Sequence, residues 1–237
     1  MADADFAAGG DGPRRIMIVE DHPIFRLGLA ELINQEPDLF VCGEAEDVSG
    51  ALKKIPDLAP DLIVVDITLK GRNGIELIKE TVRLHKGLQL LVLSMHDESL
   101  YAERALLAGA RGYIMKQEAS DSIVQAIRTV LSGRVYASEE ILSGLLNRLV
   151  TRPDLQDKPA IESLTDRELE VFTLIGRGRT TREIADHLNL SVKTIGTYRD
   201  RIKQKLDLRS GAELIRRAVL WTEKDNFGTS DSDNVGR

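Results

Sequence analysis

Short apolar runs alternate with amphipathic stretches through the first half of the chain, and this alternation restricts the fold more than any other feature. Between Arg14 and Gly133, five aliphatic runs have the length and the bounding turn residues of buried strands. Five amphipathic stretches with helical spacing alternate with them. A parallel neighbour requires a crossover connection, which a helix supplies. The sequence therefore predicts an α/β doubly wound (βα)5 domain, with a parallel sheet between two layers of helices.

The bounds of these elements follow from the pattern and from local signals. The expected strands are 14–20, 39–47, 61–66, 88–97 and 111–116. The expected helices are 25–36, 49–56, 74–85, 99–110 and 120–133. Pro23 suits a first helical turn, and Gly109 and Gly133 suit helix C-termini.

The periodicity from Ile161 onward is wholly helical. Four helices fit the segments 164–178, 180–190, 191–208 and 210–223. Thr165 followed by Glu168 is a capping box, which starts a helix. A tight turn at 189–191 then joins a short helix to a longer one that Ser191 caps, which is the pattern of a helix-turn-helix whose second helix enters the major groove. We therefore expect a small all-α helix-turn-helix domain.

These patterns divide the chain into five segments. We expect a disordered N-terminus at 1–13, the α/β domain at 14–135, a linker with a possible short helix at 136–160, the helical domain at 161–224 and a disordered tail at 225–237.

Composition places the 237-residue chain among globular proteins, with 42% hydrophobic and 30% charged residues. No apolar run approaches the ~18 residues of a membrane helix, and the start lacks the apolar segment of a signal peptide, so we expect a cytoplasmic protein without a membrane partner. The single cysteine, Cys42, is expected to be a buried small hydrophobe. Residues 161–224 hold thirteen Lys or Arg against ten Asp or Glu, a charge of +3, which leaves −9 elsewhere and hints at nucleic acid.

Charged residues stand where the predicted strands end. Glu20 and Asp21 end the first strand, and Asp66 ends the third, directly after four apolar residues. The carboxyl ends of parallel strands share one edge, where such folds bind ligands. Three carboxylates there require a cation, and oxygen ligands suit Mg²⁺. Ser94 and Lys116 end the fourth and fifth strands, where a hydroxyl and an ammonium could bind phosphoryl oxygens.

Each of these residues also has an ordinary structural interpretation. Asp66 could simply form the next turn, because Asp is a common turn former. Glu20 and Asp21 could be a solvated loop pair, and Lys116 a surface lysine.

Taken in order, these five positions resemble the receiver domain of two-component response regulators over residues 14–135. The resemblance implies that Asp66 accepts a phosphoryl group from a histidine kinase and that Ser94 and Lys116 contact this group. It implies a Mg²⁺ site of Glu20, Asp21, Asp66 and the backbone carbonyl of Thr68. It also implies that Tyr113 is a switch residue together with Ser94, although a tyrosine simply packed on the fifth strand is the alternative. Such a receiver is no enzyme beyond assisting its own phosphotransfer and dephosphorylation.

The chain departs from the usual receiver pattern after Asp66. Leu69 and Lys70 stand where Met-Pro is usual, which removes a proline that fixes φ. Thr68 and His96 occupy the two positions that influence the lifetime of the aspartyl phosphate in this family.

The motifs LTDRELEV, GRGRTTREIADHLNLSVKTI and IKQKL resemble the LuxR-type helix-turn-helix domain over residues 161–224. Joined to a receiver, this domain makes the chain similar to NarL/FixJ-type response regulators. The resemblance implies a phosphorylation-controlled, sequence-specific DNA-binding transcription regulator that forms a homodimer on DNA or when phosphorylated. A four-helix interaction module is the alternative.

The second helix of the helix-turn-helix supplies the expected DNA contacts. Ile195, Tyr198, Ile202 and Leu206 recur at helical spacing and should face the core, which leaves Gln204 among the outward residues. The expected DNA-binding residues are Lys193, Thr194, Gly196, Thr197, Arg199, Asp200, Arg201 and Lys203. Gly196, Tyr198 and Asp200 replace the residues that are usual in the family, so the DNA specificity is expected to differ. The last helix carries Leu214, Ala218 and Trp221, which either complete the core or form a dimer surface.

Two rival functions use the same residues differently. In a phosphatase of the haloacid dehalogenase type, Asp66 would be the nucleophile, but the acid required two residues later is here Thr68. The stretch GRGRTT lacks the lysine of a nucleotide-binding P-loop. The receiver could also be a dimerisation module that works without phosphorylation, which the intact carboxylates argue against.

Overall fold

The computed structural model describes residues 12–69, 72–95, 98–150 and 160–227. The chain divides into two compact units, residues 1–149 and 150–237, and each unit has its own architecture. The expected disordered terminus and tail lie almost wholly outside the described residues, as do Lys70 and His96.

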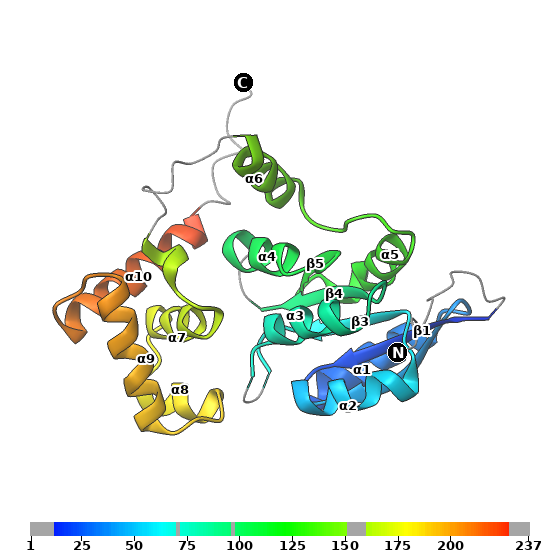
Figure 1. Cartoon of the computed structure of the whole chain (residues 1–237), viewed down its shortest axis with the longest axis horizontal. Helices are drawn as coiled ribbons and strands as arrows, with labels where there is room; N and C mark the ends of the chain where they lie inside the picture. The colour runs from blue at the N-terminus through cyan, green and yellow to red at the C-terminus, as the bar shows by residue number, and fades with distance from the viewer. Residues whose placement is uncertain (1–11, 70–71, 96–97, 151–159, 228–237) are drawn as a thin grey trace. The chain divides into compact units, whose positions relative to one another are not determined.

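The first unit contains a five-stranded parallel sheet with the order β2-β1-β3-β4-β5 (Figure 1). The strands are β1 (Arg14–Val19), β2 (Leu39–Ala45), β3 (Leu62–Asp66), β4 (Gln89–Ser94) and β5 (Gly112–Met115). The helices are α1 (Pro23–Asn34), α2 (Val48–Leu58), α3 (Gly74–Leu84), α4 (Glu98–Leu107) and α5 (Ala119–Leu131). This topology confirms the predicted doubly wound fold.

Alternate residues of the strands point to opposite faces of the sheet, so both faces need apolar side chains. On one face, Ile18, Val64 and Leu93 pack in a cluster with Ile33 of α1 and Ile127 of α5. All five residues of β3 are buried, which explains why this strand reads as a continuous apolar run that ends in one aspartate.

Local signals set the helix ends close to the predicted positions. Pro23 begins α1, and Gly109 and Gly133 have positive φ angles of 111° and 81° just beyond α4 and α5. Asn73 caps α3, because its Oδ1 accepts a hydrogen bond of 2.8 Å from the backbone N–H of Ile75. Helix α2 continues two residues past Pro56, whose fixed φ is compatible with a helix.

The chain returns to the outer edge of β5 after α5. Tyr136 forms a parallel bridge with Gly112, in which the N–H of Tyr113 donates to the carbonyl of Tyr136 at 2.8 Å and the N–H of Tyr136 donates to Arg111 at 3.0 Å. Helix α6 (Glu139–Val150) follows, within the segment for which a short helix was expected. The bridge itself has no sequence signal, because one residue cannot show a strand period.

The second unit is helical. It consists of a 3₁₀ turn, η1 (Ala160–Ser163), and of α7 (Asp166–Gly176), α8 (Thr181–His187), α9 (Val192–Lys205) and α10 (Gly211–Phe227). The capping box of Thr165 and Glu168 is confirmed, and Thr180 and Glu183 form a second one. Helix α10 extends to Phe227, so the helical domain is longer than the expected 161–224.

None of the helices in the described part of the chain combines the length and the apolar character that a membrane span requires.

Candidate functional site

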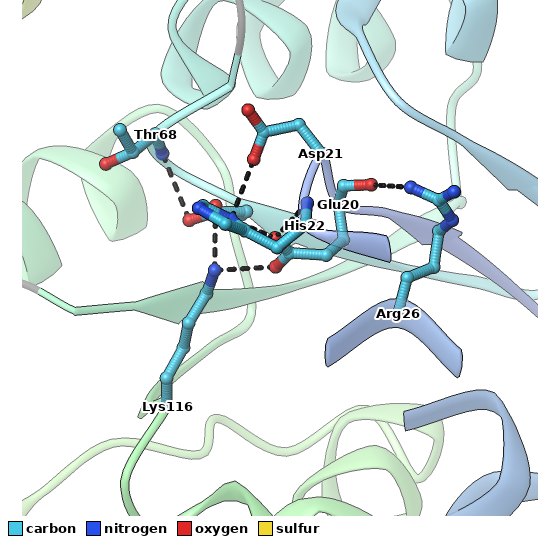
Figure 2. A network of polar contacts seen from close by, with 7 residues as sticks. Glu20, Asp21, His22, Arg26, Thr68 and Lys116 are labelled. Carbon is cyan, nitrogen blue, oxygen red and sulfur yellow. Dashed lines mark hydrogen bonds and ion pairs between the residues drawn. The ribbon is translucent and has the colours of Figure 1, made fainter. Parts of the chain in front are cut away.

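The carboxyl edge of the sheet brings charged side chains from three strands together (Figure 2). Glu20 and Asp21 directly follow β1, Asp66 is the last residue of β3, and Lys116 directly follows β5. All four are buried, with at most 8% of each residue exposed. This burial contradicts a solvated loop pair for Glu20 and Asp21 and a surface position for Lys116.

Lys116 is the cation of this cluster. Its Nζ lies 2.6 Å from Glu20 Oε2 and 2.8 Å from Asp66 Oδ2, to which it donates a hydrogen bond. The other oxygen of Asp66 accepts a hydrogen bond of 3.0 Å from the backbone N–H of Thr68. Asp66 therefore has the local contact of a turn former as well as a buried ion pair.

Burial sets the protonation of this cluster. It raises the pKa of Asp66 to about 7, and the negative charge of Glu20 adds to this effect, whereas Lys116 and the Thr68 N–H oppose it. Burial alone would lower the pKa of Lys116, but the charges and hydrogen bonds of Asp66 and Glu20 raise it by more. Lys116 thus stays charged, and its single positive charge faces three carboxyl groups.

The donor set fits a divalent cation. One ligand atom from each of Glu20, Asp21, His22 and Asp66 lies within 4.8 Å of the others. Asp21 Oδ1 is buried and accepts no hydrogen bond from the described residues, although His22 Nδ1 lies 2.9 Å away. A buried carboxylate oxygen without a donor is a suitable ligand for a hard cation such as Mg²⁺.

Ser94 and Tyr113 lie in β4 and β5, on the β5 side of Asp66 in the sheet. Ser94 ends β4, pairs with Met115 in the sheet, and its carbonyl accepts a hydrogen bond of 2.8 Å from the Lys116 N–H. Tyr113 is 1% exposed within β5. Its inward position matches a packed tyrosine and one state of a switch residue equally well.

Helix α1 and the residue before it, His22, supply three residues that sequence reasoning missed. His22 Nδ1 lies 2.8 Å from Glu20 Oε1, the ring centroid of Phe25 lies 4.8 Å from Lys116 Nζ, and Arg26 donates to the carbonyl of Glu20. They follow the acid pair directly in the sequence, which was the available signal. Their roles depend on the angle at which α1 leaves β1, and no sequence period encodes this angle.

In the second unit, α8, a turn and α9 form the predicted helix-turn-helix. Asn189 has a positive φ of 55° in the turn, and Ser191 caps α9 through a hydrogen bond of 3.0 Å from the Thr194 N–H. Ile195 and Ile202 are buried as expected. Tyr198 and Leu206 are only half-buried, so they border the core instead of filling it.

The expected DNA-facing side of α9 is only partly open. Lys193, Thr197, Asp200 and Arg201 are exposed, and the open side includes Gln204. Gly196 and Arg199 are half-buried. Four of the expected residues already have side-chain partners: the Thr194 hydroxyl lies 2.8 Å from that of Ser191, the Thr197 hydroxyl donates to the Lys193 carbonyl at 3.2 Å, and Lys203 Nζ lies 2.9 Å from Asp200 Oδ1.

The last helix completes the core of its own unit. Leu214 and Ala218 are fully buried, and the ring of Trp221 lies 5.8 Å from that of Phe172 in α7. This arrangement favours the core interpretation for these three residues. Ile215 and Leu220, each 46% exposed, are apolar residues of α10 that remain available to a partner.

Comparisons with known proteins agree with both units. Residues 16–128 match the response regulator receiver domain, and residues 162–218 match the bacterial regulatory proteins of the luxR family. The chain is 31% identical to the oxygen regulatory protein NreC of Staphylococcus haemolyticus, over 86% of this chain and 96% of NreC. It is 33% identical to the response regulator GacA of Pseudomonas viridiflava, over 86% and 95%. The chain is a response regulator of the NarL/FixJ type.

A solved structure supports the same assignment for this response regulator. RcsB from Salmonella enterica serovar Typhimurium, bound to promoter rprA in the presence of the phosphomimetic BeF3⁻, is similar with a TM-score of 0.57 and 26% identity. The match covers 88% of this chain and 99% of RcsB. As a receiver joined to a LuxR-type domain, the chain is a DNA-binding transcription regulator, and a four-helix interaction module is excluded.

Proposed function

We propose that Asp66 is the phosphoryl acceptor of this response regulator. The observation that carries the proposal is the burial of Asp66 against Lys116 and Glu20, at the edge where β1 and β3 end. An ionised Asp66 oxygen attacks the phosphorus of a phosphohistidine in a sensor histidine kinase, the P–N bond breaks, and the released imidazole nitrogen keeps the electron pair. Lys116 and Ser94 then bind the oxygens of the transferred group.

The same proposal assigns a Mg²⁺ site to Glu20, Asp21, Asp66 and the carbonyl of Thr68. The buried oxygen of Asp21 and the excess of negative charge support it. Bound there, the ion would neutralise carboxylate charge and the charge that develops on the phosphoryl oxygens. Lys116 alone balances one of three carboxylates, which is why the residues require this second cation.

The proposed output is binding of α9 in the major groove of double-stranded DNA. The RcsB complex with promoter rprA supports DNA binding, because the similarity to RcsB extends over 88% of this chain. We further propose that the phosphorylated protein binds as a homodimer, with Ser94 and Tyr113 as the switch residues. Lys193, Thr197 and Arg201, which are exposed on α9, would make most of the contacts.

Intact-mass measurement after incubation with acetyl phosphate and Mg²⁺ tests the acceptor. We expect one phosphate adduct on the parent protein and none on Asp66→Asn. Asp61→Asn is the matched control, because Asp61 precedes the opposite end of β3 and hydrogen-bonds to the Arg15 N–H. An adduct that persists in Asp66→Asn would assign the acceptor to another residue.

A further inference from the structure

Arg26 connects helix α1 to the backbone of the cation site. It lies in the first turn of α1, and its side chain is 12% exposed. Its Nη1 donates a hydrogen bond of 2.6 Å to the backbone carbonyl of Glu20, as Figure 2 shows. This carbonyl belongs to the peptide that joins Glu20 to Asp21, so Arg26 holds the peptide from which both acidic side chains extend.

Arg26 is in turn fixed by the end of β2. Its Nε donates to Glu44 Oε2 at 2.9 Å, and its Nη2 donates to Glu46 Oε1 at 3.0 Å. Between these two glutamates lies Ala45, whose carbonyl accepts a hydrogen bond of 3.0 Å from the Glu20 N–H. Both backbone polar groups of Glu20 are therefore held by one hydrogen-bonded assembly of β2 and α1.

The charge of Arg26 is balanced by its own partners. Glu44 and Glu46 carry two negative charges against one positive charge, so the guanidinium adds little positive potential to the cluster of Glu20, Asp21 and Asp66. Any positive potential that Arg26 did add would weaken the binding of a cation at this cluster. The contribution of Arg26 to the site is consequently one of geometry.

We propose that Arg26 is a positioning residue that makes the cation site selective for Mg²⁺ over Ca²⁺. Mg²⁺ requires near-octahedral ligands at 2.0–2.1 Å, whereas Ca²⁺ accepts more ligands in looser geometry. A rigid Glu20–Asp21 peptide favours the smaller ion, and a peptide released from Arg26 disfavours it. This inference rests on the proposed cation site at Glu20, Asp21 and Asp66.

Isothermal titration of the unphosphorylated full chain with Mg²⁺ and, separately, with Ca²⁺ tests the proposal. For Arg26→Met we expect the Mg²⁺ dissociation constant to rise about tenfold, as for other residues that orient metal ligands, and the Ca²⁺ constant to rise less than about threefold. Arg26→Lys keeps the charge but cannot reach all three partners, so the Mg²⁺ preference should fall in the same direction. This second variant decides the matter if Arg26→Met does not fold.

Two controls separate geometry from charge and from general stability. The double variant Glu44→Gln and Glu46→Gln keeps hydrogen-bond acceptors but exposes the charge of Arg26, so both ions should bind more weakly with an unchanged ratio. Arg128→Met also removes an arginine that pairs with two acids, Glu36 and Asp38, but these lie away from the site, so neither constant should change.

The outcomes distinguish this inference from the proposed site itself. Equal changes for both ions in Arg26→Met and Arg26→Lys, or tighter binding of both, would overturn the positioning role. If the parent binds no Mg²⁺, or if Asp21→Asn binds it as tightly as the parent does, the proposed cation site fails, and the role of Arg26 fails with it.

Discussion

At the scale of single residues, the protonation state that is stable for Asp66 without a cation differs from the one that phosphoryl transfer requires. Without a bound cation, burial favours a protonated Asp66, since its pKa is raised to about 7. A phosphoryl acceptor must instead be ionised, because the attacking oxygen needs a lone pair with negative charge. Cation binding and ionisation of Asp66 should therefore be coupled.

This coupling predicts how stability depends on pH in a chelating buffer. Asp66 keeps its proton up to about pH 7 in the folded protein, whereas in the unfolded chain it loses the proton near pH 4. Protonated Asp66 therefore stabilises the folded protein at low pH, and this contribution to the free energy of unfolding is lost as pH rises from about 4 to about 7. Relative to Asp66→Asn, the parent should lose on the order of 2–3 kcal/mol of unfolding free energy between pH 5 and pH 8. Urea titrations at both pH values measure this difference. Saturating Mg²⁺ should reduce it, and parallel curves for the two proteins would contradict the shift.

A second residue-scale prediction concerns Asp200 on α9. Asp200→Lys removes a charge that phosphates repel and releases Lys203 from its ion pair. We expect tighter non-specific DNA binding and a slope of log K against log salt that steepens by about one to two units. Titrations at several salt concentrations, on a selected site and on scrambled DNA, test this and the expected loss of preference at one base pair. Unchanged slope and preference would show that Asp200 faces away from DNA.

At the scale of elements, the strands and helices of both units follow from local pattern, and so does the list of strand-end residues. Asp66 and Lys116 could be found because each directly ends or follows an apolar run. Arg26 could not, since its partners Glu44 and Glu46 lie 18 and 20 residues away, at the end of β2 and directly after it. Periodicity also identifies the apolar face of α10 but cannot distinguish its own core from a partner, which is why Leu214 and Ala218 remained ambiguous.

Two helical glycines give a matched test of packing in the second unit. A Cβ at Gly176, the last residue of α7, would lie 2.5 Å from the carbonyl oxygen of Ala218 in α10, whereas one at Gly196 in α9 would meet nothing within 4 Å. Gly176→Ala should therefore cost about 1–3 kcal/mol by overpacking. Gly196→Ala should stabilise the unit by up to about 1 kcal/mol through helix propensity. Urea unfolding followed by the fluorescence of Trp221, the only tryptophan, measures both changes, and the same sign for both would refute the packing argument.

At the scale of the whole molecule, two units with separate cores share one chain, and the proposed signal must pass between them. In this proposal a phosphoryl group on Asp66 would change the charge of the first unit, whereas α9 of the second unit would bind DNA. Self-association of the protein could carry this signal without a fixed contact between the two units of one chain. When two first units associate, the two second units are held together, and binding of one to DNA raises the effective concentration of the other at a neighbouring half-site.

We therefore expect phosphorylation to promote dimers and to tighten binding to paired half-sites about one helical turn apart. Sedimentation velocity of the acetyl phosphate-treated protein should show dimers on such DNA. Ile215→Glu, which places a charge on one of the two exposed apolar positions of α10, Ile215 and Leu220, should weaken the complex on paired half-sites more than on a single half-site. A phosphorylated protein that stays monomeric on paired sites would argue against this mechanism.

The backbone bridge at Tyr136 affects how readily the protein can aggregate through the edges of its sheet. Open-ended polymerisation by strand addition requires two free sheet edges, because each molecule must accept a neighbour on both sides. Tyr136 occupies backbone groups of Arg111 and Tyr113 on the outer side of β5, one of the two edge strands of the sheet, and so shortens the unpaired part of that edge. We therefore expect edge-to-edge pairing to be less favourable at β5 than at β2, so the bridge should hinder the growth of fibrils by strand addition.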